Sequence, residues 1–216
     1  MKIRRLLTLA CCVALTTAAC GADGGGISPT TTATTGGTTT TASPGTTSGT
    51  TATTQAPDDG LGPFAEFFSI AHPFSVEYPE SWEVEEDSGG AVVTFLSELT
   101  SDDDLFHENV NVVVEDLGGV ELTLEEYVDA AVTQLPGLIP DIQINDEFGD
   151  VMGGQPSWIL TYTGTQEGFG FTWVQEVALF EGAAYILTYS GLNEGDDYLE
   201  FRPHAIAIFQ SFDFRD

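Results

Sequence analysis

Three long segments near the C-terminal end alternate between apolar and polar residues and are separated by very short connections. The segments span 157–164, 169–180 and 183–190, with four and two residues between them. A period of two indicates β-strands, and connections this short join antiparallel neighbours. We therefore expect an antiparallel meander, which strongly limits the folds open to this chain.

Shorter segments with the same period precede the meander. They lie at 74–78, 91–96 and 109–115, and a less regular one lies at 142–148. Each is rich in the β-branched and aromatic residues that pack well on a pleated surface. We expect all four to be strands.

Two helices are predicted between and after these strands. Thr123 and Glu126 have the spacing of a capping box, so a helix is expected to begin after Thr123. The Pro-Gly pair at 136–137 predicts its end. A second helix is expected at about 198–210, with Pro203 in the first turn, because only there is a missing N–H harmless.

The order of these elements predicts the fold class. Strands and helices do not alternate regularly along the chain, which is typical of α+β proteins with an antiparallel sheet. Ile159 and Leu160 are adjacent apolar residues of one strand, as are Val92 and Val93. Adjacent residues of a strand project to opposite faces, so we expect other elements to pack on both faces of the sheet. We expect a three-layer α/β/α sandwich around an antiparallel β-sheet.

The first 20 residues have the composition of an export signal. Lys2, Arg4 and Arg5 precede an apolar run over 6–19. This run is too short to span a bilayer comfortably, since about 20 apolar residues are needed. We therefore expect 1–20 to be a signal peptide.

The apolar run ends in a sequence that resembles a bacterial lipobox. In Thr17-Ala18-Ala19-Cys20-Gly21, small residues precede a cysteine that would carry two fatty acyl chains such as palmitate. Thr17 departs from the pattern, because Leu, Val or Ile is usual there, and ordinary cleavage near Ala19 is the alternative. We expect Cys20 to anchor a lipoprotein on the extracytoplasmic side of the cell membrane.

The next segment, 21–60, consists mainly of Thr, Gly, Ser, Ala and Pro. It contains 15 threonines between positions 30 and 54 and shows no apolar period. Such a composition cannot bury enough apolar surface to offset the entropy of ordering the chain. We expect 21–60 to be a disordered tether and 61–216 to be the folded domain.

The charge of the chain excludes several classes of partner. The sequence has 34 acidic residues and 5 basic ones, and beyond residue 20 the only basic side chains are Arg202 and Arg215. Binding to nucleic acid or to an anionic lipid surface needs clustered Lys and Arg. We expect no nucleic-acid partner, and membrane contact through the N-terminal lipid only.

One acidic loop contains candidate metal ligands. Asp102, Asp104, His107 and Glu108 offer the carboxylates and imidazole that bind Ca²⁺ or another divalent cation. The spacing does not match an EF-hand, and a solvated acidic loop is the alternative. No other cofactor is indicated.

Four other residues are candidate ligand contacts. Trp158, Tyr162 and Trp173 recur at period two and offer an aromatic pocket for an apolar or sugar ligand, although such residues also form sheet cores. Arg202 is a candidate ligand anchor, or else a structural partner for groups at the start of the last helix.

No catalytic motif is present. The sequence has no Gly-x-Ser-x-Gly elbow, and no cysteine remains in the folded domain to act beside a histidine. A hydrolase that uses a pair of carboxylates stays an open alternative, because acidic residues are abundant. We expect the protein not to be an enzyme.

Four segments, 73–82, 109–112, 122–127 and 201–214, carry a resemblance that covers about 68–214. They resemble the PsbP-like superfamily, which includes PsbP, DcrB and LpqN-like bacterial lipoproteins. The resemblance implies the PsbP-like fold and a non-catalytic scaffold or binding module for a cell-envelope protein. A cation- or small-ligand-binding lipoprotein is the alternative.

Overall fold

The computed structural model describes the folded domain. The described residues are 60–101, 103–104, 106–193 and 197–215. The predicted signal peptide, Cys20 and nearly all of the tether lie outside them. Among the described residues, no helix is long and apolar enough to cross a membrane.

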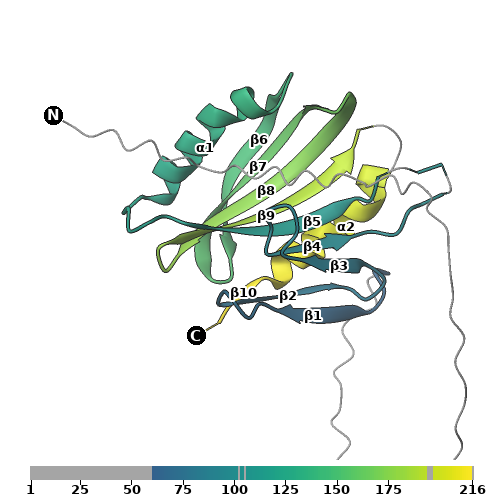
Figure 1. The fold of residues 1–216 in the computed structure, drawn as a ribbon, viewed down its shortest axis with the longest axis horizontal. Helices are drawn as coiled ribbons and strands as arrows, with labels where there is room; N and C mark the ends of the chain where they lie inside the picture. The colour runs from purple at the N-terminus through teal and green to yellow at the C-terminus, as the bar shows by residue number, and fades with distance from the viewer. Residues whose placement is uncertain (1–59, 102, 105, 194–196, 216) are drawn as a thin grey trace, which may run out of the picture. The chain divides into compact units, whose positions relative to one another are not determined.

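The domain contains two antiparallel sheets and two helices (Figure 1). α1 (Leu124–Leu138) follows β5, and α2 (Asp197–Ser211) follows β9. The strands are β1 (Phe64–Phe68), β2 (Phe74–Pro79), β3 (Glu83–Glu86), β4 (Val93–Leu96), β5 (Asn109–Asp116), β6 (Gln143–Met152), β7 (Gln155–Gln166), β8 (Phe169–Phe180), β9 (Ala183–Leu192) and β10 (Asp213–Phe214).

The predicted meander forms three of the seven strands of the larger sheet. That sheet has seven strands in the order β3-β4-β5-β9-β8-β7-β6, and the smaller one has the order β1-β2-β10. Strands β7, β8 and β9 pair as antiparallel neighbours, with Tyr162 opposite Trp173 and Trp173 opposite Ser190. This pairing confirms the antiparallel meander that the short connections predicted.

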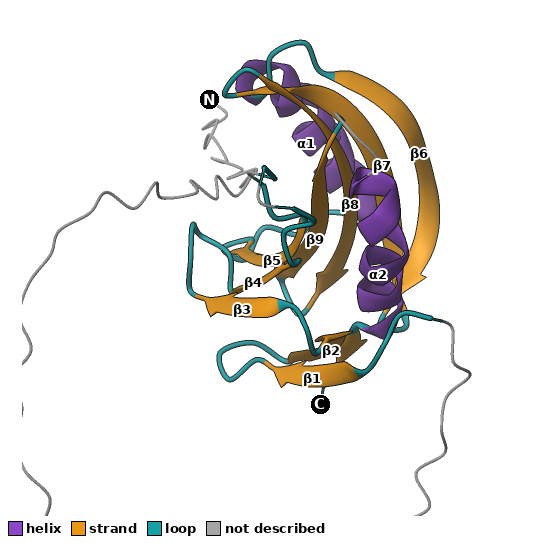
Figure 2. Ribbon diagram, turned by 90° about the vertical axis from the view of Figure 1, so that its right-hand side faces the viewer, coloured by secondary structure: helices purple, strands orange, loops and turns teal. Residues whose placement is uncertain are grey.

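The two helices cover opposite faces of the seven-stranded sheet (Figure 2). Leu160 and Trp173 pack with Leu135 of α1 on one face. On the other face, Leu187 packs with Ile208 of α2 and with residues of the small sheet. The domain is thus the predicted α+β sandwich of three layers, with the small sheet beside α2 in the third layer.

Helix α1 begins as predicted but ends later. The Thr123 hydroxyl accepts from the N–H of Glu126 at 3.2 Å, and the Glu126 carboxylate accepts from the N–H of Thr123 at 2.9 Å. Pro136 and Gly137 lie inside the last turn rather than ending it. There a proline removes a single helical N–H, and the N–H of Ile139 still donates to the carbonyl of Leu135.

Helix α2 has the predicted bounds to within one residue at each end, but Pro203 is not in its first turn. The helix starts at Asp197, so Pro203 is its seventh residue. Tyr198 stabilises the first turn, because its ring stacks on Tyr189 with centroids 5.4 Å apart. The carbonyl of Leu199 loses the N–H that residue 203 would normally donate, but Leu199 is 62% exposed, so water can reach this turn.

Several strands differ from the prediction. β1 was not expected, the short strands β3 and β10 lie outside the predicted strand segments, and β6 extends four residues beyond the predicted 142–148. In β6 every side chain except Met152 is exposed, and the register shifts between Ile144 and Asp146. A strand exposed on both faces and interrupted by a bulge lacks a clear period of two.

Candidate functional site

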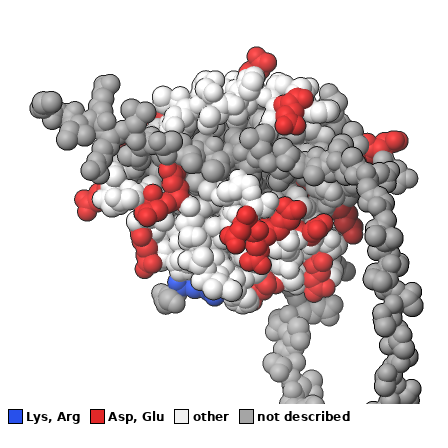
Figure 3. Space-filling model, in the orientation of Figure 1, with Lys and Arg blue, Asp and Glu red and all other residues white. Residues whose placement is uncertain are grey.

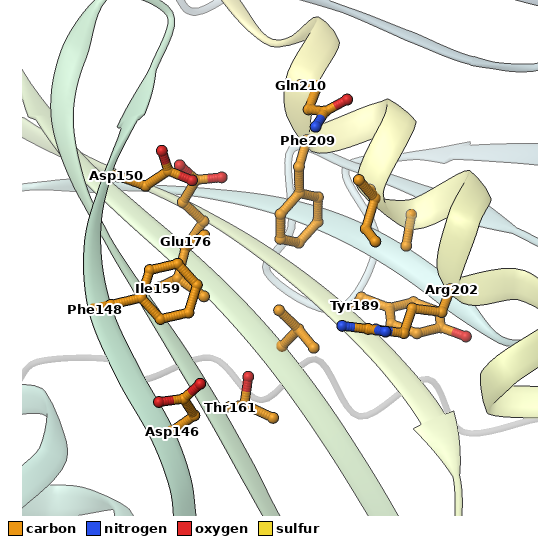
Figure 4. A pocket seen from close by; sticks show the side chains of 13 residues that line it. Asp146, Phe148, Asp150, Ile159, Thr161, Glu176, Tyr189, Arg202, Phe209 and Gln210 are labelled. Atoms are coloured by element: carbon orange, nitrogen blue, oxygen red, sulfur yellow. The ribbon is translucent and has the colours of Figure 1, made fainter.

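A groove of about 230 Å³ lies between α2 and the face of the sheet formed by β6, β7 and β8 (Figure 4). The sheet supplies Phe148, Ile159 and Val174. The helix supplies Ala205, Ile206 and Phe209. The middle of the groove is therefore apolar, and its charged groups lie at the ends.

Glu176 is a buried carboxylic acid at one end of this groove. Its side chain is 4% exposed, and it accepts a hydrogen bond from the Ser157 hydroxyl at 2.6 Å. Burial raises the pKa of Glu176, the bond from Ser157 opposes this, and the nearby Asp150 carboxylate adds to the increase. Two acids thus share one end of the groove, where a cation would relieve their repulsion.

Arg202 lies on the side of the groove away from these acids (Figure 4). Tyr189 also lines the groove, and its hydroxyl donates to the carbonyl of Tyr198 at 2.9 Å. Burial raises the pKa of Tyr198, and the neighbouring Arg202 guanidinium partly opposes this. Arg202 therefore contacts the first turn of α2 while it lines the groove.

A second hollow of about 310 Å³ continues along the outer side of α2. It shares Arg202 and Ile206 with the groove and adds Leu199 and Pro203. Leu199 and Ile206 are 62% and 43% exposed. An apolar strip therefore runs from the groove over the exposed side of α2.

The other arginine of the domain has a structural role. The Arg215 guanidinium donates to the carbonyl of Ser69 and lies 5.3 Å from the centre of the Phe68 ring. Its backbone N–H donates to the carbonyl of Pro73. Arg215 thus fastens the C-terminal end of the chain to the small sheet.

The described residues of the predicted metal loop form hydrogen bonds within the protein. Asp104 accepts from the N–H groups of Thr100 and Phe106; despite partial burial, these bonds and the Thr100 hydroxyl hold its pKa below the usual value. His107 Nδ1 contacts the carbonyl of Ser97, and Glu108 is 1% exposed and accepts from the N–H of Leu192. Asp102 lies outside the described residues.

A cation site needs several converging ligands. Within the part of the chain that the structure describes, no group of three or more His, Cys, Asp or Glu residues could hold a metal ion.

The predicted aromatic ligand residues do not lie in the groove. Tyr162 and Trp173 stack with centroids 5.4 Å apart in the core beneath α1, where they are 0% and 1% exposed. Trp158 projects from the same face of β7 as Tyr162, because the two residues are four positions apart. Of the four ligand candidates, the structure brings only Arg202 to the groove.

Sequence reasoning missed Glu176, Ser157 and Asp150. With 34 acidic residues in the chain, a further Glu carries little information. One signal was available. Val174, Glu176 and Ala178 project from the same face of their strand, and the apolar residues on either side of Glu176 indicate that this face is buried.

Comparison of the sequence with protein-family models and with curated proteins finds no match. Comparison of the fold finds solved structures. The cyanobacterial PsbP protein (CyanoP) of Synechocystis is 16% identical with a TM-score of 0.52, and the match covers 74% of this chain and 97% of that chain.

LpqN of Mycobacterium tuberculosis, a protein described as involved in cell envelope biogenesis, is also similar. It is 15% identical with a TM-score of 0.53, and the match covers 71% of this chain and 92% of that chain. At these identities the likeness concerns the fold. The chain therefore has the PsbP-like fold, as its sequence resemblance predicted.

Proposed function

We propose that this chain is a lipid-anchored, extracytoplasmic, non-catalytic module that binds a cell-envelope protein. The groove beside α2 carries this proposal, because it joins an apolar strip to a buried acid and an arginine. An exposed apolar surface with a few well-placed polar groups is typical of binding sites. The described role of LpqN in the cell envelope supports the location.

The chemistry of the groove favours binding over catalysis. Beside the groove, the Ser157 hydroxyl donates a hydrogen bond to the Glu176 carboxylate. A nucleophilic serine also needs a group that orients its base, whereas Glu176 has a second acid, Asp150, as its charged neighbour. The groove supplies charge and apolar surface in a fixed arrangement, which is what recognition requires.

The lipid anchor is tested by cell fractionation. We expect the wild-type protein in the membrane fraction and accessible to external protease, and Cys20→Ser in the soluble fraction, because two acyl chains hold a protein on a bilayer. If Cys20→Ser stays membrane-bound, the anchor is not at this residue.

Binding is tested by photo-crosslinking in intact cells. A photoreactive phenylalanine analogue replaces Ile206 in the groove or, as the control, Leu138, which is 53% exposed in the last turn of α1. We expect a discrete crosslinked protein from position 206 and none from position 138. Equal products from both positions would contradict binding at the groove.

A further inference from the structure

The two ends of the groove differ in charge, and this difference restricts what the groove can hold. Glu176 and Asp150 lie together at one end, Asp146 lies farther along β6 beyond Phe148, and Arg202 lies across the groove from the Glu176–Asp150 pair (Figure 4). An occupant that carries a positive charge is attracted to the acidic end and repelled from the arginine. The groove therefore favours one orientation of a cationic occupant.

The apolar middle specifies the rest of the occupant. Phe148 and Ile159 are paired residues on β6 and β7, and Glu176 is the next residue in the same line across the sheet, on β8. Apolar surface thus leads from the exposed edge strand toward the buried acid. Lysine and arginine have the matching shape, because an aliphatic stem carries a charged head.

The size of the groove agrees with a side chain. Its volume of about 230 Å³ is below the range of about 300–1,000 Å³ that is usual for pockets enclosing drug-sized ligands. A single long side chain fits this space, and the neighbouring residues of its chain can rest on the apolar strip formed by Leu199 and Ile206.

We propose that the groove takes a lysine or arginine side chain of the partner protein, with its cationic head at Glu176 and Asp150. The aliphatic stem lies on Phe148, Ile159 and Val174. This inference rests on the proposed binding function and adds the chemistry of the residue that is recognised.

The basic residue belongs to a different protein. Beyond residue 20 the chain has no lysine, and its two arginines are Arg202, which already lines the groove, and Arg215, which is bonded to Ser69 and packed on Phe68. A second copy of the mature chain therefore offers no free basic side chain. The excess of acidic residues also makes two copies repel each other.

The buried acid makes this contact selective. Glu176 bonds one neutral donor, the Ser157 hydroxyl, through Oε1. A charged head adds a charge-assisted hydrogen bond in a place where water is largely excluded, and such bonds are stronger than those between neutral groups. An uncharged guest leaves the acid pair without a counter-charge.

The test is a nuclear magnetic resonance titration of the mature chain carrying Cys20→Ser, with labelled isoleucine methyl groups. The probes are acetyl-Val-Arg-Val-amide, its Lys analogue and its uncharged Gln analogue. We expect the Arg and Lys probes to shift the signals of Ile159 and Ile206, while Ile186 beneath α1 stays unchanged. The Gln probe should bind at least tenfold more weakly.

Two substitutions on β6 separate the site from the general charge of the protein. Asp150 lines the groove, whereas Glu147 is exposed on the opposite face of the same strand. Asp150→Asn should weaken binding of the Arg probe severalfold, and Glu147→Gln should leave it unchanged. Equal effects of the two substitutions, or equal binding of the Arg and Gln probes, would overturn the proposal.

Failure of this inference is distinguishable from failure of the proposed function. If the Arg and Gln probes bind equally but position 206 still crosslinks in cells, the groove binds a partner through other chemistry. Only the recognition of a basic side chain is then refuted. If position 206 does not crosslink while the Arg probe binds normally, the proposed cellular function is refuted.

Discussion

At the scale of single residues, Glu176 is the most informative side chain. Burying a carboxylate costs free energy unless it is paired or protonated, and this one has a second acid, Asp150, close by. A glutamine could keep the bond to Ser157 without this cost. Such an unfavourable group is more frequent at functional sites than in structural cores.

Glu176 predicts a pH dependence of stability. Burial raises its folded-state pKa above the ordinary value of 4.5, so the folded protein holds this proton more tightly than the unfolded chain. The stabilisation is complete below the unfolded-state pKa and is lost as the pH rises through the folded-state pKa. Denaturant unfolding at a series of pH values should show this loss in the wild type and not in Glu176→Gln.

The matched control is Glu147→Gln, an exposed acid on β6. The other charged or titratable groups that line the groove are Asp146, Asp150, Tyr189 and Arg202, and both variants keep them. The pH profile of Glu147→Gln should follow that of the wild type. If the pH profile of Glu176→Gln also follows that of the wild type, burial does not raise the pKa of the Glu176 carboxyl.

Residue roles were predictable from the sequence only where a local pattern defined them. Thr123 and Glu126 are three positions apart and their reciprocal bonds depend on that spacing alone. The relation between Glu176 and Ser157 depends on the register of β7 against β8, and that between Glu176 and Asp150 on a further strand. Such relations are set by the sheet, which no short pattern encodes.

At the scale of elements, periodicity was a reliable guide for the buried central strands. β8 and β9 are largely buried, and their predicted bounds match the structure within two residues. Periodicity predicted the bounds of β6 poorly, because its side chains are exposed. The bounds of α2 were predicted to within one residue, but the expected place of Pro203 in its first turn was wrong. Packing of Tyr198 on Tyr189 stabilises the turn that precedes this proline.

The contact between α1 and the sheet predicts an effect of substitution at Gly164. A Cβ atom at this position on β7 would meet Ile139 Cγ2 and would lie 3.1 Å from the carbonyl oxygen of Pro140. Gly164→Ala should therefore lower the free energy of unfolding by about 1–3 kcal/mol, as overpacking does. Gly149→Ala on β6 has only one neighbour, at 3.9 Å, and should be nearly neutral in the same denaturant unfolding measurement.

At the scale of the whole molecule, the dominant property is negative charge. Acidic side chains are scattered over the face shown in Figure 3 rather than gathered in one patch. Scattered carboxylates hold hydration and keep a protein soluble, and they also repel one another. Adaptation to salty surroundings and a simple solubility surface are the two interpretations.

Salt dependence of the melting temperature separates these interpretations. If the chain is adapted to salt, raising NaCl from about 10 mM, where the Debye length is about 30 Å, to 1 M, where it is about 3 Å, should raise the melting temperature at pH 7 by several degrees. The same change near pH 3.5, where many carboxylates are protonated, should have a smaller effect. A melting temperature at pH 7 that does not respond to NaCl would refute adaptation to salt.

Competition in photo-crosslinking tests the binding function most directly. Cells carrying the photoreactive analogue at position 206 are irradiated with increasing acetyl-Val-Arg-Val-amide or its Gln analogue. We predict that the Arg probe reduces the crosslinked product in proportion to its occupancy of the groove, while the Gln probe has little effect at the same concentration. A product that persists when the Arg probe saturates the groove would contradict recognition of the partner at Glu176 and Asp150.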